Sequence, residues 1–253
     1  MHDYFTVIHY HKATPEQFSV HIKYLENAFN VSPLSLLRDH YVKGVELPEK
    51  SLFVTFDDGW KSNYDLLPVI EENDFPVTIF LSTGLVGSDR KPRNKVIYDD
   101  YRVDEDLLRL ITGEHEELAV EVPYDQRIML SKREVEEMSG VIDFQSHGVN
   151  HHVSSAIPVD LMDYELRESK RFIEELTKRE VFAFAFPYNV VSNEAYSLLK
   201  KRGYALARAG TRRYSKIGTD PFKINSIGMI PHWSTKQMRR ALALAEFKTY
   251  ITI

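Results

Sequence analysis

The chain has no cysteine among its 253 residues. Disulfide bonds, thiolate zinc sites and cysteine nucleophiles are therefore all excluded. It also lacks any run approaching the roughly 18 apolar residues that a membrane-spanning helix needs. The N-terminus has no basic stretch followed by a long apolar one, so it does not read as a signal peptide, and we expect a cytoplasmic protein without a membrane span.

A basic face is missing as well. The 32 Lys and Arg residues are outnumbered by 37 Asp and Glu residues, which gives a net charge of −5. Proteins that bind the phosphates of nucleic acids need clustered positive charge. We therefore expect no nucleic-acid partner. The hydrophobic fraction of 43% is ordinary for a soluble globular protein.

Short segments rich in Val, Ile, Phe and Tyr alternate with longer amphipathic segments, and several are apolar throughout, as in strands covered on both faces. Strands are predicted over Tyr4–Ile8, Leu52–Phe56, Pro76–Leu81, Val141–Gln145, Val181–Phe186, Tyr204–Ala207 and Ile224–Met229. Helices are predicted over Pro15–Phe29, Tyr64–Asn73, Ser131–Met138, Pro158–Lys178, Asn193–Arg202 and Thr235–Phe247.

Alternation over the whole length favours one α/β domain covering residues 1–253. Seven strands fit a somewhat incomplete (β/α) barrel, and a doubly wound open sheet is the alternative. Residues 87–130 break the alternation and are interpreted as an insertion with its own small helix near Asp104–Ile111. Long insertions of this kind tend to lie over the active face of a barrel.

Polar residues follow several of the predicted strands. Asp57 and Asp58 end the second strand, His147 follows the fourth, and Pro187-Tyr188 ends the fifth. In either α/β architecture the reactive groups lie at the C-terminal ends of the strands. We therefore expect these residues to meet at one mouth of the fold.

The residue types at this mouth predict a divalent metal site beside a second acid. Successive strand residues point in different directions, so one of Asp57 and Asp58 can bind a metal while the other faces the substrate. His147 and His151 are four residues apart, and a helical turn would place both on one face. One Asp with two His is a frequent catalytic metal set. Taken singly, Asp-Asp-Gly is most often a turn, and His-x-x-x-His is most often exposed.

Three motifs in series resemble a known family. Thr55–Gly59, Ser146–His151 and Phe184–Tyr188 are similar in order and approximate spacing to the motifs of the NodB-homology polysaccharide deacetylases, carbohydrate esterase family 4. The resemblance extends to Tyr10-His11 and covers nearly all of the chain except Gly87–Leu130. It implies a single distorted (β/α)7 barrel and metal-dependent hydrolysis of an N-acetyl or O-acetyl group on a saccharide.

The resemblance also assigns roles. It implies that Asp57 is the general base and that Asp58, His147 and His151 hold the metal, typically zinc and sometimes cobalt or nickel. It further implies that the backbone N–H of Tyr188 helps to hold the oxyanion.

The chain departs from the family pattern at two places. The family's late Leu-x-x-His-like motif, which supplies the catalytic acid, is missing, so His232 and His11 are the candidates for the acid. The family also carries an arginine two residues before the motif proline, where it pairs with the base. Ala185 stands there, which would leave the charge of Asp57 less compensated.

The substrate is only partly bounded by the sequence. Trp60, Phe186 and Tyr188 are candidate flat faces for a sugar ring, with a place in the core or on the rim as the alternative for each. The pair Arg212-Arg213 is a candidate contact for an anionic sugar or a diphosphate-linked intermediate, against the alternative of a solvated surface. The expected partner is thus an acetylated saccharide, and the lack of an export signal favours an intracellular precursor.

Two other functions remain open from the sequence. One is an amidohydrolase acting on a small non-sugar amide in the same fold. The other is a catalytically inactive saccharide-binding module, which the missing arginine and late histidine favour. The presence of Asp57, Asp58, His147 and His151 argues against the inactive module.

Overall fold

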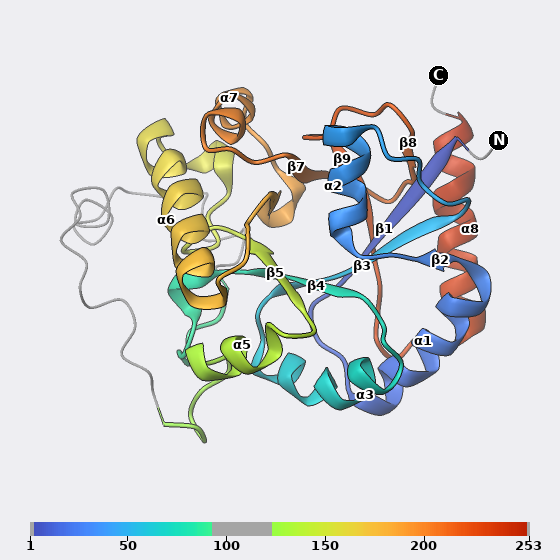
Figure 1. Cartoon of the computed structure of the whole chain (residues 1–253), viewed down its shortest axis with the longest axis horizontal. Helices are drawn as coiled ribbons and strands as arrows, with labels where there is room; N and C mark the ends of the chain where they lie inside the picture. The colour runs from blue at the N-terminus through green and yellow to red at the C-terminus, as the bar shows by residue number, and fades with distance from the viewer. Residues whose placement is uncertain (1–2, 93–122, 252–253) are drawn as a thin grey trace.

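The computed structural model describes residues 3–92 and 123–251 as a closed barrel of parallel strands surrounded by helices (Figure 1). The strands follow one another around the barrel in the order β1, β3, β4, β5, β6, β7 and β9, and β1 pairs with both β9 and β3 to close it. Their bounds are β1 Tyr4–Tyr10, β3 Ser51–Asp58, β4 Val77–Leu81, β5 Asp143–Ser146, β6 Ala183–Ala185, β7 Leu206–Thr211 and β9 Ile224–Gly228. The barrel prediction is confirmed, and the open-sheet alternative is wrong.

The helices cover the outside of the barrel. They are α1 Pro15–Ala28, α2 Leu34–Lys43, α3 Leu67–Glu72, α5 Lys132–Met138, α6 Val159–Thr177, α7 Asn193–Lys201 and α8 Thr235–Ile251. The short 3₁₀ helices are η1 Lys61–Leu66, η2 Thr83–Leu85, η4 Ser154–Ala156 and η5 Pro187–Asn189. Thr14 and Ser131 begin α1 and α5 with capping boxes, since each side chain accepts a hydrogen bond from the backbone three residues on.

Three elements were not anticipated. Strand β2 (Asn30–Val31) pairs with β3, and β8 (Ser215–Lys216) pairs antiparallel with β1. Helix α2 follows Pro33, which offers no side-chain cap, and it buries only Leu34 and Leu37. Without a capping residue or a long apolar stripe, α2 has a weak sequence signature.

The interior of the barrel changes character along its axis. Alternate strand residues point inwards, and near the N-terminal ends these are apolar, as with Phe5, Phe53 and Leu206. Leu34 and Leu37 of α2 pack against the same cluster. Towards the C-terminal ends of the strands the inward residues are polar, as with Asp57 on β3 and Arg208 on β7. The site therefore lies at that end.

The predicted insertion is described only at its two flanks, residues 87–92 and 123–130. Both flanks are tied to the end of β3, because Leu130 donates a backbone hydrogen bond to Gly59 and Gly87 donates one to Leu130. The helix expected near Asp104–Ile111 lies outside the described residues. Within residues 3–92 and 123–251, no helix is both long and apolar enough to cross a membrane.

Candidate active site

A cavity of about 540 Å³ opens at the C-terminal ends of the strands. Residues from six segments of the chain line it: His9, His11, Asp57, Asp58, Trp60, Lys91, Pro92, His147, His151, Tyr188, Asn189 and Arg208. The mouth predicted from the strand ends is thus formed, and most of the predicted site residues meet there.

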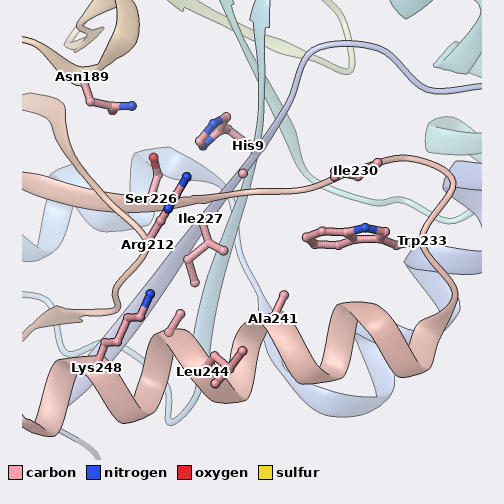
Figure 2. Close-up of a pocket in the computed structure, with 12 residues that line it drawn as sticks. His9, Asn189, Arg212, Ser226, Ile227, Ile230, Trp233, Ala241, Leu244 and Lys248 are labelled. Atoms are coloured by element: carbon pink, nitrogen blue, oxygen red, sulfur yellow. The ribbon is translucent and has the colours of Figure 1, made fainter.

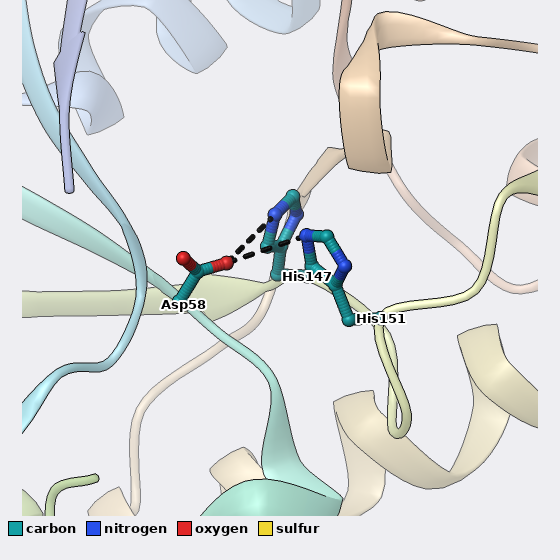
Figure 3. Close-up of side chains that lie close together, drawn as sticks. All are labelled: Asp58, His147 and His151. Atoms are coloured by element: carbon teal, nitrogen blue, oxygen red, sulfur yellow. Dashed lines mark ion pairs between the residues drawn. The ribbon is translucent and has the colours of Figure 1, made fainter. Parts of the chain in front are cut away.

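Asp58, His147 and His151 lie at the centre of this cavity with their ligand atoms turned towards one another (Figure 3). Oδ1 of Asp58 is 3.5 Å from Nε2 of His147 and 3.3 Å from Nε2 of His151. One ligand atom from each residue lies within 4.8 Å of the other two. Oδ1 of Asp58 is buried and has no hydrogen-bond partner among the described residues. A carboxylate oxygen and two imidazole nitrogens arranged in this way fit a single divalent cation.

His147 and Asp58 are each oriented by a second contact. Nδ1 of His147 lies 2.6 Å from the carbonyl of Ala185, so it donates its proton there and leaves Nε2 with a lone pair. Trp60 donates from its indole nitrogen to Oδ2 of Asp58 at 2.8 Å, which leaves Oδ1 for the imidazoles. Burial lowers the pKa of both His147 and His151 to about 4, so these side chains are neutral at pH 7. Neutral imidazoles are the form that binds a metal.

The two histidines lie on a loop, so the prediction of a shared helical face is wrong. Strand β5 ends at Ser146, and positive φ angles of 81° at Gly148 and 57° at His151 turn the chain. The carboxylate of Glu165 on α6 accepts hydrogen bonds from the backbone N–H of Val149 at 2.7 Å and of Asn150 at 3.0 Å. The loop is therefore fixed by a buried acid on α6.

Gly148 also allows that acid to approach. A Cβ atom at this position would lie 2.6 Å from Oε2 of Glu165, closer than a real contact permits. His152, the histidine next to the proposed ligand, is buried and lies 2.9 Å from Oε1 of Glu165 through Nδ1. Glu165 thus steadies the loop that carries His147 and His151.

Asp57 is paired with an arginine, which corrects the expectation drawn from Ala185. Arg208 on β7 donates from Nη1 to Oδ1 of Asp57 at 2.8 Å and from Nη2 to Oδ2 at 2.5 Å. Both side chains are buried. Arg208 is the register partner of Ala185 on the neighbouring strand β6. The positive charge beside Asp57 therefore comes from Arg208 on β7, the strand next to the one on which the family motif places its arginine.

This pairing decides the charge of Asp57. Burial alone would raise the pKa of the carboxyl, but the adjacent Arg208 guanidinium outweighs burial and holds the pKa below its usual range. Asp57 is thus ionised and held in one orientation by a bidentate contact.

Two predicted site residues lie elsewhere. Phe186 is fully buried and packs edge-on against Phe184 at 4.9 Å, so the prediction that it faces a sugar is wrong. It lies one residue past Ala185, whose side chain belongs to the inner cluster, and strand alternation turns Phe186 outwards into the helix layer. His232 is exposed in the loop before α8 and does not line the cavity, so the structure does not bring it to the site.

The remaining candidates are placed at the cavity. His11 and Trp60 line it, and the ammonium group of Lys12 lies 3.6 Å from the centre of the Trp60 ring. Tyr188 lies at the rim with 41% of its surface exposed and its ring edge-on to His151 at 5.3 Å. Its φ angle is 58°, in the left-handed region.

Three residues of this site were missed or left out of the predicted set: Arg208, Glu165 and His9. An arginine inside the apolar stretch Leu206–Ala209 is a signal that could have been used, because a buried charge needs a partner. Glu165 carries a similar signal, since it lies on the apolar face of α6. His9 lines the cavity beside Asp57, and burial followed by the charge of Arg208 lowers the pKa of His9 to about 3.

The sequence and the fold both have counterparts among known proteins. A family model described as polysaccharide deacetylase matches residues 44–207. No curated protein matches the chain.

Solved structures share the fold at low sequence identity. The deacetylase PplD of Streptococcus pyogenes, solved with acetate, superimposes with a TM-score of 0.71 at 16% identity, covering 94% of this chain and 98% of its own. IcaB of Ammonifex degensii gives 0.70 at 19% identity, with 94% and 97% covered. A polysaccharide deacetylase of Bacillus cereus gives 0.67 at 21% identity, with 94% and 68% covered.

Proposed function

The chain belongs to the polysaccharide deacetylase family, and we propose that it uses one divalent cation, zinc, to hydrolyse the N-acetyl group of a saccharide. The observation that carries this proposal is the convergence of Asp58, His147 and His151. A buried carboxylate oxygen, with no hydrogen-bond partner among the described residues, lies within 3.5 Å of two neutral imidazole nitrogens. These three side chains would hold the cation. When bound, it would polarise the acetyl carbonyl and lower the pKa of a bound water towards ~7.

Asp57 is the proposed general base. Its carboxylate lines the same cavity as the proposed ligands, and it is ionised, so it can accept a proton from water. Proton transfer by a positioned group of this kind contributes roughly 10²–10⁴-fold to the rate. Arg208 fixes the orientation of Asp57 through two hydrogen bonds and is a positioning residue in this scheme.

His11 is the proposed acid. The amine that leaves an acetamide needs a proton, and His11 lines the cavity on the segment that follows β1. The backbone N–H of Tyr188 is proposed to contact the oxygen on which negative charge develops. Trp60 and Tyr188 are proposed as the walls that contact the sugar ring, since both line the cavity.

The inactive binding module loses one of its two supports. It was favoured by the absence of both the arginine before the motif proline and the late histidine, and Arg208 now takes the place of that arginine beside Asp57. The structure offers no specific feature that selects a small cyclic amide over a saccharide.

The proposal is tested by acetate release from N-acetylated glucosamine oligosaccharides. Wild-type protein loaded with zinc is expected to release acetate, while Asp57→Asn is expected to keep its zinc and lose at least about 10²-fold in turnover. A parallel panel of small cyclic amides separates the amidohydrolase from the deacetylase. Cleavage of the cyclic amides alone, or full activity of Asp57→Asn, would contradict the proposal.

A further inference from the structure

A second cavity of about 470 Å³ adjoins the one that holds the candidate metal site. The two share His9 and Asn189 in their walls, so the second continues from the first. It runs between the end of β9 and helix α8 (Figure 2). Nothing in the proposed reaction uses this space.

Unpartnered polar atoms border this second cavity. Ser226 is fully buried and lies in the cavity wall, and its hydroxyl has no hydrogen-bond partner among residues 3–92 and 123–251. Nδ1 of His9 and Oδ1 of Asn189 are likewise buried and unpartnered within the described part of the chain. Buried polar groups normally have partners, so the Ser226 hydroxyl, together with the two atoms on the wall shared by both cavities, indicates a polar ligand.

The cavity is cationic at one end and apolar at the other. Figure 2 shows Arg212 and Lys248 on one side and Trp233 on the opposite side, with α8 beneath. Arg212 has a φ angle of 59°, a left-handed conformation that is costly for a non-glycine residue. Its backbone N–H donates to the carbonyl of Ser226 at 2.7 Å, which ties it to the cavity wall.

We propose that this second cavity is a subsite for a phosphate group carried by the saccharide substrate, with Arg212 and Lys248 contacting the phosphate and Ser226 donating a hydrogen bond. The inference rests on the proposed function, because the acetylated sugar is proposed to bind at the metal site in the adjoining cavity. Two cations suit the charge of a phosphate. Trp233, which is partly buried, lines the apolar end of the same cavity. The substrate class is therefore a sugar phosphate or a diphosphate-linked sugar.

Binding to the wild-type protein tests the subsite independently of turnover. Glucosamine, glucosamine 6-phosphate and UDP-glucosamine carry no acetyl group, so their affinities can be measured by titration calorimetry without hydrolysis. At least one of the two phosphorylated probes is expected to bind about tenfold or more tightly than glucosamine. Which of the two binds more tightly distinguishes a phosphate monoester from a diphosphate linkage.

Arg212→Ala is expected to remove about tenfold of that affinity and to leave glucosamine binding unchanged. Arg213→Ala is the matched control, because Arg213 is the next residue and is exposed like Arg212, but does not line the cavity. Ser226→Ala is expected to weaken the phosphorylated probe severalfold.

Equal affinity for all three probes, no measurable binding of either phosphorylated probe at millimolar concentration, or equal losses in Arg212→Ala and Arg213→Ala would each overturn the subsite. Acetate release from neutral oligosaccharides would then persist. If deacetylation fails instead, the preference for phosphate remains measurable, so the two failures are distinguishable.

Discussion

Arg208 on β7 donates two hydrogen bonds to the carboxylate of Asp57 at the end of β3, and both side chains are buried. The expected motif position on β6 holds Ala185, the register partner of Arg208. A charge needed inside the barrel can come from any strand whose inward residue reaches the same point. The pairing keeps Asp57 ionised although its side chain is buried.

Arg208→Ala should be strongly harmful. It leaves the carboxylate of Asp57 buried without its cation, and breaking a buried pair costs about 3–5 kcal/mol. Urea unfolding is expected to show that loss, and turnover should fall because the base is no longer held in place. The double variant Arg208→Ala with Ala185→Arg is expected to recover part of the turnover, since it restores a guanidinium at the register-matched position. A fully stable and active Arg208→Ala protein would show that the pair has no role.

Metal retention should depend on the three converging side chains. His147→Ala and Asp58→Ala are expected to lower bound zinc from about one ion per chain to near zero, because each removes a ligand from a set of three. His232→Ala is the control, since His232 is exposed and outside the cavity. Elemental analysis after dialysis gives the stoichiometry. Unchanged zinc in His147→Ala would refute the ligand set.

The source of the leaving-group proton can be decided between two histidines. His11→Ala is expected to reduce turnover of an N-acetyl substrate by roughly 10²-fold or more while keeping zinc, because a positioned acid contributes in this range. His232→Ala is expected to leave turnover unchanged. Steady-state kinetics of the two variants, run with the same substrate, supplies the comparison. If both variants match the wild type, the acid lies elsewhere.

The ligand loop should be sensitive at Gly148. Gly148→Ala places a Cβ 2.6 Å from Oε2 of Glu165 in a backbone with φ of 81°, and strain of this kind costs about 1–3 kcal/mol. Lower stability and weaker zinc binding are expected together, because Glu165 holds the loop that carries His151. Gly140→Ala is the matched control, since a Cβ there meets no atom within 4 Å. Equal effects of the two substitutions on zinc affinity would argue against a role for the Glu165 contact.

Stability should depend on pH through Glu134, which does not line the candidate active site. Burial alone would raise the pKa of this carboxyl, but hydrogen bonds from Arg127 and from the backbone of Ser131 lower it overall. A lowered folded-state pKa stabilises above the unfolded value of about 4.3, and the contribution disappears as pH falls through the folded value. The difference in unfolding free energy between wild type and Glu134→Gln is therefore expected to be largest at pH 7 and to shrink below about pH 4. A difference that grows on acidification would contradict this assignment.

Particular residues show how far sequence reasoning reached. The seven barrel strands were predicted because their apolar runs are local, and helices α1 and α5 were predicted to within one residue at each end because their patterns also involve neighbouring residues. The positions of Asp58 and His147 at strand ends were predicted for the same reason. Helix α2 was missed because its start has no side-chain cap.

The sequence by itself determined the barrel class, the family and the set of residue types that converge at the mouth, because periodicity and motif order are properties of neighbouring residues. Only the tertiary structure decided which arginine neutralises Asp57, that Glu165 rather than a helical turn holds the histidine loop, and that Phe186 faces outwards. These outcomes depend on strand register, on inward or outward alternation and on contacts between distant segments, which no local pattern encodes.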